Sequence, residues 1–248
     1  MNNRDVFILG AIILAGAIAV ELYSNFTNSL IDYTPGSYTS LIIGAPQQFD
    51  YYKDGILLGT YTYTLNTQNN VSSTLYTLET SVDLTYQGKP LRVDTAHRFL
   101  DEVSHVNYTV DVNIDGVKTN LECIFLGAKA LIKTSSQGKN QTTTVTLPAN
   151  TVLIDNNNPA HWELLMKSFN AEAGKKYSIN ALVPQGAIVQ KNEFSKATSH
   201  QFVNIDSKSY ECVVAREPNY QITLYFYNGD LIQYKNDIDG IIIVKKMH

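Results

Sequence analysis

Histidines are the residues of this 248-residue chain best suited to acid–base or metal chemistry, and five occur. Glu102 precedes His105 by three positions, a spacing that on a helix would suit a metal ion or a general base. Residues 91–99 have the pattern of a strand instead, and no H-E-x-x-H motif is present. We therefore expect His97 and His105 to be solvated polar groups near a turn, and His161 to lie on the surface of a helix.

The other motifs that could carry chemistry are weak. No G-x-S-x-G, P-loop or G-x-G-x-x-G motif occurs, so the common hydrolase and nucleotide-binding signatures are missing. Asp230, Asp237 and Asp239 could bind a cation through their carboxylates, but they lack the alternating spacing of an EF-hand loop. We expect them to be exposed turn residues. The sequence predicts no catalytic, cofactor-binding or metal site, and therefore a non-enzymatic protein.

Cys123 and Cys212 are the two cysteines of the chain, and both lie in strand-like stretches. Outside the cytoplasm a lone pair of cysteines tends to be oxidised. A disulfide between them would close a long loop and stabilise the fold by roughly 4–5 kcal/mol in the entropic model. We expect this disulfide, and the alternative is two separately buried thiols.

Four N-glycosylation sequons begin at Asn25, Asn70, Asn107 and Asn140. A chain this rich in Asn, Ser and Thr contains about as many by chance, so the sequons do not themselves indicate export. If the protein is exported, the candidates for glycosylation are Asn70, Asn107 and Asn140. Asn70 and Asn140 fall near predicted turns, whereas Asn107 falls in a predicted strand.

The N-terminal segment decides where the protein is expected to reside. An uncharged run extends from Val6 to Val20, and Val6–Tyr23 would span roughly 27 Å as a helix, close to the thickness of a hydrocarbon core. It could be a retained signal-anchor helix, a cleaved signal peptide ending at small residues such as Ala17-Ile18-Ala19, or a buried helix. We expect residues 1–23 to form a transmembrane anchor or signal segment. The C-terminal part would then lie outside the cytoplasm, or be secreted if the segment is cleaved.

The rest of the chain divides into a linker and one domain. Residues 24–45 lack periodicity and contain Pro35-Gly36, which predicts a linker or stalk, although a strand could form over 38–43. Residues 46–248 are expected to form one extracytoplasmic β domain.

Period-2 patterns bounded by turn dipeptides recur through this domain. Asp54-Gly55, Asp115-Gly116 and Asn228-Gly229 each separate two such patterns, and these are strong hairpin signals. In residues 60–65, Thr alternates with Tyr61, Tyr63 and Leu65, which predicts a strand with one aromatic face. Long strands joined by tight turns predict an antiparallel meander, and the helix described next would pack against it if the sheet is curved.

One segment has a helical pattern. Asn158 and Pro159 suit the N-cap and first position of a helix over Pro159–Phe169. Trp162, Leu165, Met166 and Phe169 then form an apolar stripe. We expect this helix to pack against the curved sheet. The fold class is mainly β, with one packed helix and a preceding N-terminal transmembrane or signal helix.

The balance of charge excludes some classes of protein. The chain has 19 Lys and Arg against 23 Asp and Glu, a net charge of −4, and only 17% of its residues are charged. A nucleic-acid-binding protein normally has a basic excess. A disordered chain needs high net charge and low hydrophobicity. The sequence therefore predicts a folded protein that does not bind nucleic acid.

Several stretches together resemble a known family. They are the helix preceded by residues 147–155, the run Gly174-Lys175-Lys176-Tyr177, residues 210–214, and residues 222–233 with their Asn228-Gly229 turn. This order is similar to that of lipoprotein-carrier half-barrel proteins (LolA/LppX-like) and their periplasmic relatives, over about residues 50–235. The resemblance implies a curved sheet around a cavity for lipids or acyl chains. A lipobox cysteine near the apolar segment is missing, so the resemblance does not imply a lipid anchor.

Together these features predict a membrane-anchored, non-enzymatic domain that binds an apolar or lipid-like ligand, or a membrane-protein partner, through its curved sheet. The helix would cover one mouth of the cavity. The residues expected to line the cavity or fill the core are Tyr61, Tyr63, Leu126, Trp162 and Met166.

The alternative is a structural subunit of a surface filament, surface layer or viral envelope, in which the linker pairs with a neighbouring subunit's sheet edge. Archaeal type IV pilins and archaellins also begin with an apolar helix followed by a β domain. Here the apolar run is short, and no clear class III processing site precedes it.

Overall fold

The computed structural model describes residues 30–34, 36, 38, 40–69, 71, 73–100, 104–155, 158–169 and 171–247. The predicted anchor or signal segment 1–23 lies outside these ranges, and so do residues 24–29 of the predicted linker and the sequon residue Asn70. No helix in the described ranges combines the length and the hydrophobicity that crossing a membrane requires.

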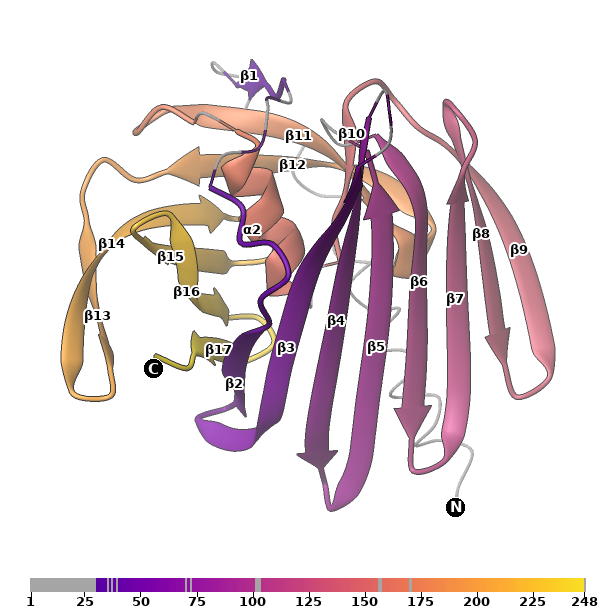
Figure 1. Ribbon diagram of the computed structural model, residues 1–248, viewed down its shortest axis with the longest axis horizontal. Coiled ribbons are helices and arrows are strands. Elements are labelled where there is room, and N and C mark those ends of the chain that lie inside the picture. The colour runs from indigo at the N-terminus through magenta and orange to yellow at the C-terminus, as the bar shows by residue number, and fades with distance from the viewer. Residues whose placement is uncertain are drawn as a thin grey trace.

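The strands form one open, curved sheet of 17 strands (Figure 1). The first run of antiparallel hairpins comprises β2 (Gln47–Lys53), β3 (Ile56–Asn69), β4 (Thr74–Tyr86), β5 (Lys89–Phe99), β6 (His105–Ile114), β7 (Val117–Phe125), β8 (Lys129–Ser136) and β9 (Lys139–Thr146). The second comprises β11 (Lys176–Val183), β12 (Ile188–Lys196), β13 (Gln201–Ile205), β14 (Lys208–Glu217), β15 (Ile222–Tyr227), β16 (Asp230–Asn236) and β17 (Ile241–Lys245). β17 pairs with β2 and joins the two runs, while β1 (Ile31–Asp32) and β10 (Thr151–Leu153) pair in parallel with β11.

The residues in the tight turns determine which residues pair across each hairpin. Asp54-Gly55, Asp115-Gly116 and Asn228-Gly229 all have positive φ at both positions, the conformation that a tight two-residue hairpin requires. Each of these predicted turns is confirmed, and the Gln87-Gly88 turn between β4 and β5 has the same conformation. The predicted mainly β fold with a curved antiparallel sheet and one packed α-helix is confirmed for the described residues.

The aromatic face of β3 turns toward the inside of the curve. Tyr61, Tyr63 and Leu65 are buried, while the intervening threonines are only partly buried. This alternation was predicted from the period of two. The buried side chains of β3 belong to the main hydrophobic cluster, which also contains side chains of β2, β4, β5 and β15–β17.

Helix α2 (Pro159–Lys167) lies inside the curve of the sheet, between the β2–β5 wall and the strands of the second run (Figure 1). Trp162 and Leu165 of α2 belong to the main cluster, and Met166 packs against it. The buried residues of α2 are on all sides of the helix and include His161, Glu163 and Lys167. A helix buried all round is enclosed rather than laid on a surface.

The described part of the predicted linker packs against α2. Tyr33 is buried, and the backbone N–H of Gly36 donates to the carbonyl oxygen of Ser168 at 2.9 Å. Tyr38 makes edge-on contacts with Tyr76 and Phe99. The strand considered for residues 38–43 does not form in their described part. We call the described residues of 30–46 the strap, because they pass across the C-terminal end of α2 (Figure 1).

The predicted disulfide is wrong. Cys123 and Cys212 are both buried and both free within the described structure. Cys123 of β7 belongs to a cluster with Tyr108 and Ile132, whereas Cys212 of β14 belongs to a separate cluster under the β13–β14 hairpin. Different parts of the sheet therefore hold the two thiols. Burial raises the pKa of Cys123 to about 12, which keeps this thiol protonated and unreactive.

The close packing of β3 against β4 can be tested at Gly59. It pairs with Leu84 of β4, and a side chain at this position would collide with the backbone carbonyl of Asp83. We expect Gly59→Ala to lower the free energy of unfolding by about 1–3 kcal/mol, the usual effect of overpacking. Chemical denaturation would measure it. Thr64→Ala on the same strand is the control and should cost less than about 1 kcal/mol; equal effects of the two changes would contradict the packing described for Gly59.

Candidate functional site

Helix α2 and the sheet around it form the candidate site, because buried polar side chains gather there. A buried polar group needs a hydrogen-bond partner, and a buried charge needs an opposite charge. The buried polar residues of α2 and its two ends are Asp155, Asn158, His161, Glu163, Lys167 and Ser168. Their partners come from the sheet wall and from the strap.

Tyr61 of β3 caps the N-terminus of α2. Its hydroxyl donates to Asn158 Oδ1 at 2.8 Å and accepts the backbone N–H of Ala160 at 3.2 Å. Asn158 Nδ2 lies 3.4 and 3.3 Å from the hydroxyls of Thr80 and Thr95. Asn158 is the N-cap residue, as predicted, but its side chain joins the helix to β3, β4 and β5. Burial raises the pKa of Tyr61 well above its usual value, so its hydroxyl keeps its proton.

Asp155 ties the start of α2 to β6. The hydroxyl of Tyr108 donates to Asp155 Oδ2 at 2.5 Å, and the backbone N–H of Asp155 donates to His161 Nδ1 at 3.1 Å. Burial and the adjacent carboxylate hold the pKa of Tyr108 well above its usual value. Asp155 therefore connects a wall strand directly to the first turn of the helix.

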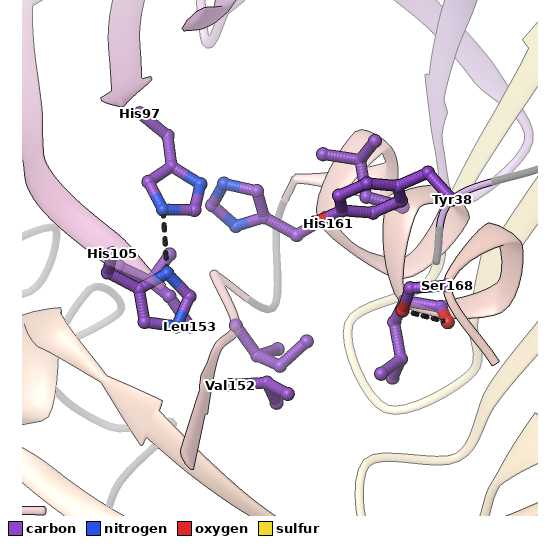
Figure 2. A pocket seen from close by; sticks show the side chains of 10 residues that line it. Tyr38, His97, His105, Val152, Leu153, His161 and Ser168 are labelled. Atoms are coloured by element: carbon purple, nitrogen blue, oxygen red, sulfur yellow. Dashed lines mark hydrogen bonds between the residues drawn. The ribbon is translucent and has the colours of Figure 1, made fainter. Parts of the chain in front are cut away.

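Three histidines from three elements meet beside this turn (Figure 2). His97 Nε2 lies 3.0 Å from His105 Nδ1, and His105 Nε2 lies 3.2 Å from the carbonyl oxygen of Thr151. The rings of His97 and His161 are 5.2 Å apart and nearly perpendicular. The predictions that His161 lies at the surface and that His97 is solvated are wrong, because both residues are buried near α2. His105 is partly buried beside them and borders the same cavity.

Enclosure keeps these histidines neutral. Burial lowers the pKa of His105 to about 4, despite the hydrogen bond to Thr151, which acts in the opposite direction. Burial and the nearby His105 lower the pKa of His161 to about 3. Burial, His105 and His161 together hold the pKa of His97 well below its usual value. At neutral pH the cluster is therefore uncharged.

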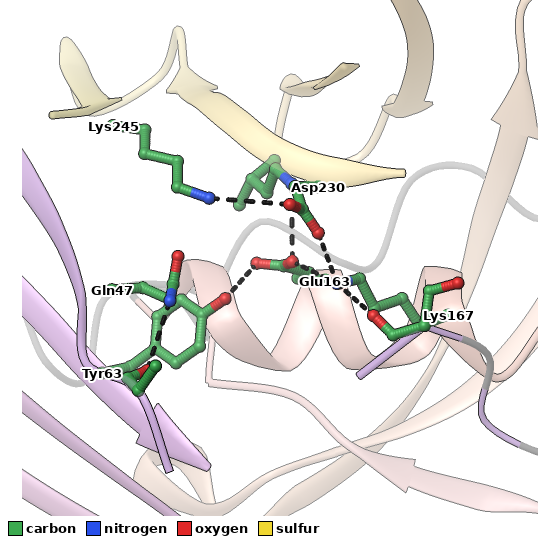
Figure 3. A network of polar contacts seen from close by, with 9 residues as sticks. Gln47, Tyr63, Glu163, Lys167, Asp230 and Lys245 are labelled. Carbon is green, nitrogen blue, oxygen red and sulfur yellow. Dashed lines mark hydrogen bonds and ion pairs between the residues drawn. The ribbon is translucent and has the colours of Figure 1, made fainter. Parts of the chain in front are cut away.

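A buried ion pair fixes the middle and the end of α2 (Figure 3). Lys167 Nζ lies 2.9 Å from Glu163 Oε1 and 2.9 Å from Asp230 Oδ1. Tyr63 of β3 donates to Glu163 Oε2 at 2.7 Å. Burial acts to lower the pKa of Lys167, but the carboxylates of Glu163 and Asp230 outweigh it and raise the pKa. The ammonium group is charged, and it bridges the helix to β16.

The strap makes the last contacts with α2. Tyr33 Oη lies 3.1 Å from Ser168 Oγ, and Lys167 Nζ donates to the carbonyl oxygen of Ser40 at 3.1 Å. A Cβ at Gly36 would lie 2.9 Å from the carbonyl oxygen of Ser168, so a side chain there would force the strap away from the helix. The strap thus closes the curve over the C-terminal end of α2.

Two small cavities border α2. One, of about 20 Å³, lies among the three histidines, Tyr38 and Ser168, and the other, of about 10 Å³, lies beside Tyr63 and Leu164. The first has room for about one water molecule, whereas ligand pockets usually measure about 300–1,000 Å³. Helix α2 therefore occupies the space that a ligand would need in the concave face.

The predicted lining residues fall into two groups. Tyr61, Tyr63 and Trp162 are buried around or on α2, and Met166 packs against the same cluster. Leu126 lies in the turn after β7 and is 61% exposed, so its predicted place in the lining is wrong. The strand alternation that would have turned it inward ends at Phe125.

The remaining predicted sites are scattered. Asn107 lies within β6, its Oδ1 is buried, and it is poorly placed to carry a glycan, whereas Asn140 of β9 is exposed. Asp230 binds Lys167, Asp237 binds Lys235, and Asp239 accepts a hydrogen bond from Asn236, so these carboxylates have separate partners. In the described part of the chain, no group of three or more His, Cys, Asp and Glu side chains could hold a metal ion.

Sequence reasoning missed Glu163, Lys167 and Asp155. The spacing of Glu163 and Lys167 is that of an ordinary exposed ion pair on a helix, so the pattern alone does not reveal burial. One local feature of the sequence does fit an enclosed helix. The first turn, Pro159-Ala160-His161-Trp162, contains no Asp, Glu, Lys or Arg and so has no charged face for water.

The buried ion pair makes a quantitative prediction. Lys167→Met leaves Glu163 buried without its cation, and we expect it to lower the free energy of unfolding by about 3–5 kcal/mol. Lys133, which pairs at 2.9 Å with Glu122 on the exposed face, is the matched control. Lys133→Met should cost about 0–1 kcal/mol. Urea denaturation of both variants would measure this, and equal effects would contradict the enclosure of Lys167.

The solved structures similar to this chain include two proteins of unknown function. A β-barrel-like protein of a domain of unknown function, DUF1849, from Brucella abortus has 16% identity and a TM-score of 0.47; the match covers 83% of this chain and 97% of that one. A DUF1089 family protein from Pseudomonas aeruginosa has 13% identity and a TM-score of 0.37, with 71% and 89% covered. No protein-family model and no curated protein matches the chain. Neither similar structure is described as a lipoprotein carrier, and that resemblance stays a prediction.

Proposed function

We propose that the chain is a non-enzymatic binding domain, and that its apolar or lipid-like ligand enters the concave face of the sheet when α2 moves out. This proposal rests on one observation. Helix α2 is enclosed by the sheet and is held by hydrogen bonds and ion pairs, although the wall behind it is mainly apolar. In the ligand-free state α2 occupies the ligand's place.

The wall behind α2 suits an apolar ligand. Phe49, Tyr61, Tyr63, Leu78 and Phe99 are buried there in one cluster with Trp162. Together these side chains offer a broad surface of rings and aliphatic groups once the helix is removed. An acyl chain could bury itself against this surface in place of Trp162 and Leu165, with a similar hydrophobic gain per unit area.

The polar attachments support a helix that moves. Replacing a buried ion pair by apolar residues of similar volume is often neutral or stabilising, so an ion pair such as Glu163–Lys167 is weak evidence for a role in stability alone. Hydrogen bonds and ion pairs can be exchanged for bonds to water when α2 leaves. A helix held by apolar contacts alone would lose those contacts when it leaves and would gain no bonds to water in exchange.

The cellular setting of this function is also proposed. An extracytoplasmic domain held at a membrane, near a source of lipid-like ligands or a membrane-protein partner, rests on the apolar run Val6–Val20 alone. The non-enzymatic role rests on the lack of the common hydrolase and nucleotide-binding motifs in the sequence.

A fluorescent C16 fatty acid is the probe that tests the proposal. Lys167→Met weakens the attachment of α2, so we expect it to bind the probe at least several-fold more tightly than the wild-type protein. Lys133→Met removes a lysine from an exposed ion pair and should leave the affinity unchanged. Fluorescence titration measures all three proteins. Probe binding by none of them, or equal affinities for all three, would contradict the proposal.

A structural subunit is the second candidate, and β1 is the observation that favours it. β1 pairs over only two residues, Ile31 with Tyr177 and Asp32 with Ser178, at an edge of the sheet. A strand this short could exchange between neighbouring copies by pairing with a neighbour's β11.

Light scattering tests the second candidate. Exchange of β1 predicts a mass that rises in steps above the 27.7 kDa of one chain as the concentration increases. Ile31→Pro, which weakens β1 pairing, should return the protein to a single chain. A mass of one chain at all concentrations would contradict strand exchange.

A further inference from the structure

Two neighbouring histidine rings at the start of α2 each have one buried nitrogen that lacks a hydrogen-bond partner among the described residues. His97 Nδ1 and His161 Nε2 have no hydrogen-bond partner among the described residues. The centroids of these two rings are 5.2 Å apart and the rings are nearly perpendicular, as neighbours in Figure 2. The cavity of about 20 Å³ lies beside them. Apolar side chains form most of the cavity lining, but His97, His105 and His161 also border it, and it has room for about one water molecule.

The hydrogen bonds of the cluster determine the protonation of His105 and His97. A carbonyl oxygen only accepts, so the proton of neutral His105 is on Nε2, which donates to Thr151. His105 Nδ1 is then an acceptor, and His97 must donate to it from Nε2. The free Nδ1 of His97 is therefore a lone pair.

The same reasoning determines the protonation of His161. Its Nδ1 accepts the backbone N–H of Asp155 and therefore has the lone pair. The proton of neutral His161 is on Nε2. The two unpartnered nitrogens are thus one donor and one acceptor.

A donor and an acceptor on neighbouring rings that both border a small cavity can be joined by one water molecule. The water would accept from His161 Nε2 and donate to His97 Nδ1. A metal ion between them would need lone pairs on both nitrogens. His161 cannot offer one at Nε2 while its Nδ1 accepts from Asp155, so the arrangement suits water.

We propose that His161, one bridging water, His97 and His105 form an acid-sensitive latch that fastens α2 to the sheet. The hydrogen bonds run in one direction, from the Asp155 amide through the three rings to the Thr151 carbonyl. They join α2 to β5, β6 and β10.

Acid opens the latch because a second proton turns an acceptor into a donor. Protonated His161 can no longer accept from Asp155, and protonated His97 can no longer accept the hydrogen bond that the bridging water donates. The neutral rings have pKa values below the ~6.5 of an exposed histidine, so the released state takes up protons first. The latch is therefore fully stable above about pH 6.5 and weakens below it, by up to about tenfold per pH unit for each histidine.

Other titratable groups also lie around the three histidines. Tyr108 of β6 keeps its proton throughout the relevant range. Asp155 accepts the hydrogen bond of Tyr108, and Glu163 and Lys167 face β3 and β16 instead. The titratable groups that face the two nitrogens or line their cavity are Tyr38, His97, His105, Tyr108, Asp155 and His161.

The latch shares with the proposed function only the movement of α2, and it needs no ligand. The two can therefore fail separately. An acid-induced release without uptake of the fatty-acid probe contradicts the proposed function alone. Probe uptake without any acid-induced release contradicts the latch alone.

The fluorescence of Trp162 measures the release of α2 from the sheet, because Trp162 is the sole tryptophan of the chain and is fully buried on α2. We expect its fluorescence emission to shift to longer wavelength between about pH 6.5 and pH 4.5, while far-UV circular dichroism shows that the sheet is retained. The double variant His97→Gln/His161→Asn keeps neutral polar groups at both positions and cannot titrate there. In this variant the shift of Trp162 emission should be absent, or its midpoint should lie at least one pH unit lower than in the wild-type protein.

His200→Gln is the matched control, because His200 is exposed beside Glu211. It should leave the midpoint of the Trp162 shift unchanged. The latch is contradicted if the wild-type shift coincides with loss of the sheet signal, or if the double variant has the wild-type midpoint.

NMR of imidazole nitrogens in the wild-type protein tests the latch without any substitution. At neutral pH we expect His97, His105 and His161 all to have their proton on Nε2. A proton on Nδ1 of any of the three rings would contradict the direction of the hydrogen bonds and therefore the latch. This result holds even if the double variant does not fold.

Discussion

The polar bonds between α2 and the concave face are the constraint on which the rest of the structure depends. A helix enclosed by a sheet cannot direct its charged side chains to water, so each must find a partner on the wall. Tyr61, Tyr63 and Tyr108 supply hydroxyls from β3 and β6, and Asp230 supplies a carboxylate from β16. These partners fix the position and rotation of the helix, which apolar contacts alone would leave less specified.

This constraint links the fold to the proposed binding role. The concave face is broad and aromatic, and among the described residues α2 lies in it beside cavities of about 20 and 10 Å³. The proposed ligand would therefore enter after the helix has moved. Because the attachments are polar and the proposed latch runs through three histidines, the energy of that movement can respond to pH as well as to the ligand. The strap adds Tyr33 and Ser40 to the contacts that would have to break.

Local signals in the sequence predict the parts of the fold that local physics determines. Asp-Gly and Asn-Gly turns favour tight hairpins, and the alternation of Tyr61 and Tyr63 identifies the inner face of β3. The enclosure of α2 depends on the accumulated curvature of many strands, which no short window contains. For that reason the sequence predicts His97, His105 and His161 as separate polar residues, and Cys123 and Cys212 as partners. Only the tertiary structure brings the histidines together and separates the cysteines.

The central claim is that α2 can leave the sheet while the sheet stays folded. Native-state hydrogen exchange, measured amide by amide against low concentrations of denaturant, tests it most directly. The account predicts that the amides of α2 exchange through an opening of lower free energy than those of β3–β6. Equal opening free energies for α2 and these strands, both matching global unfolding, would contradict it.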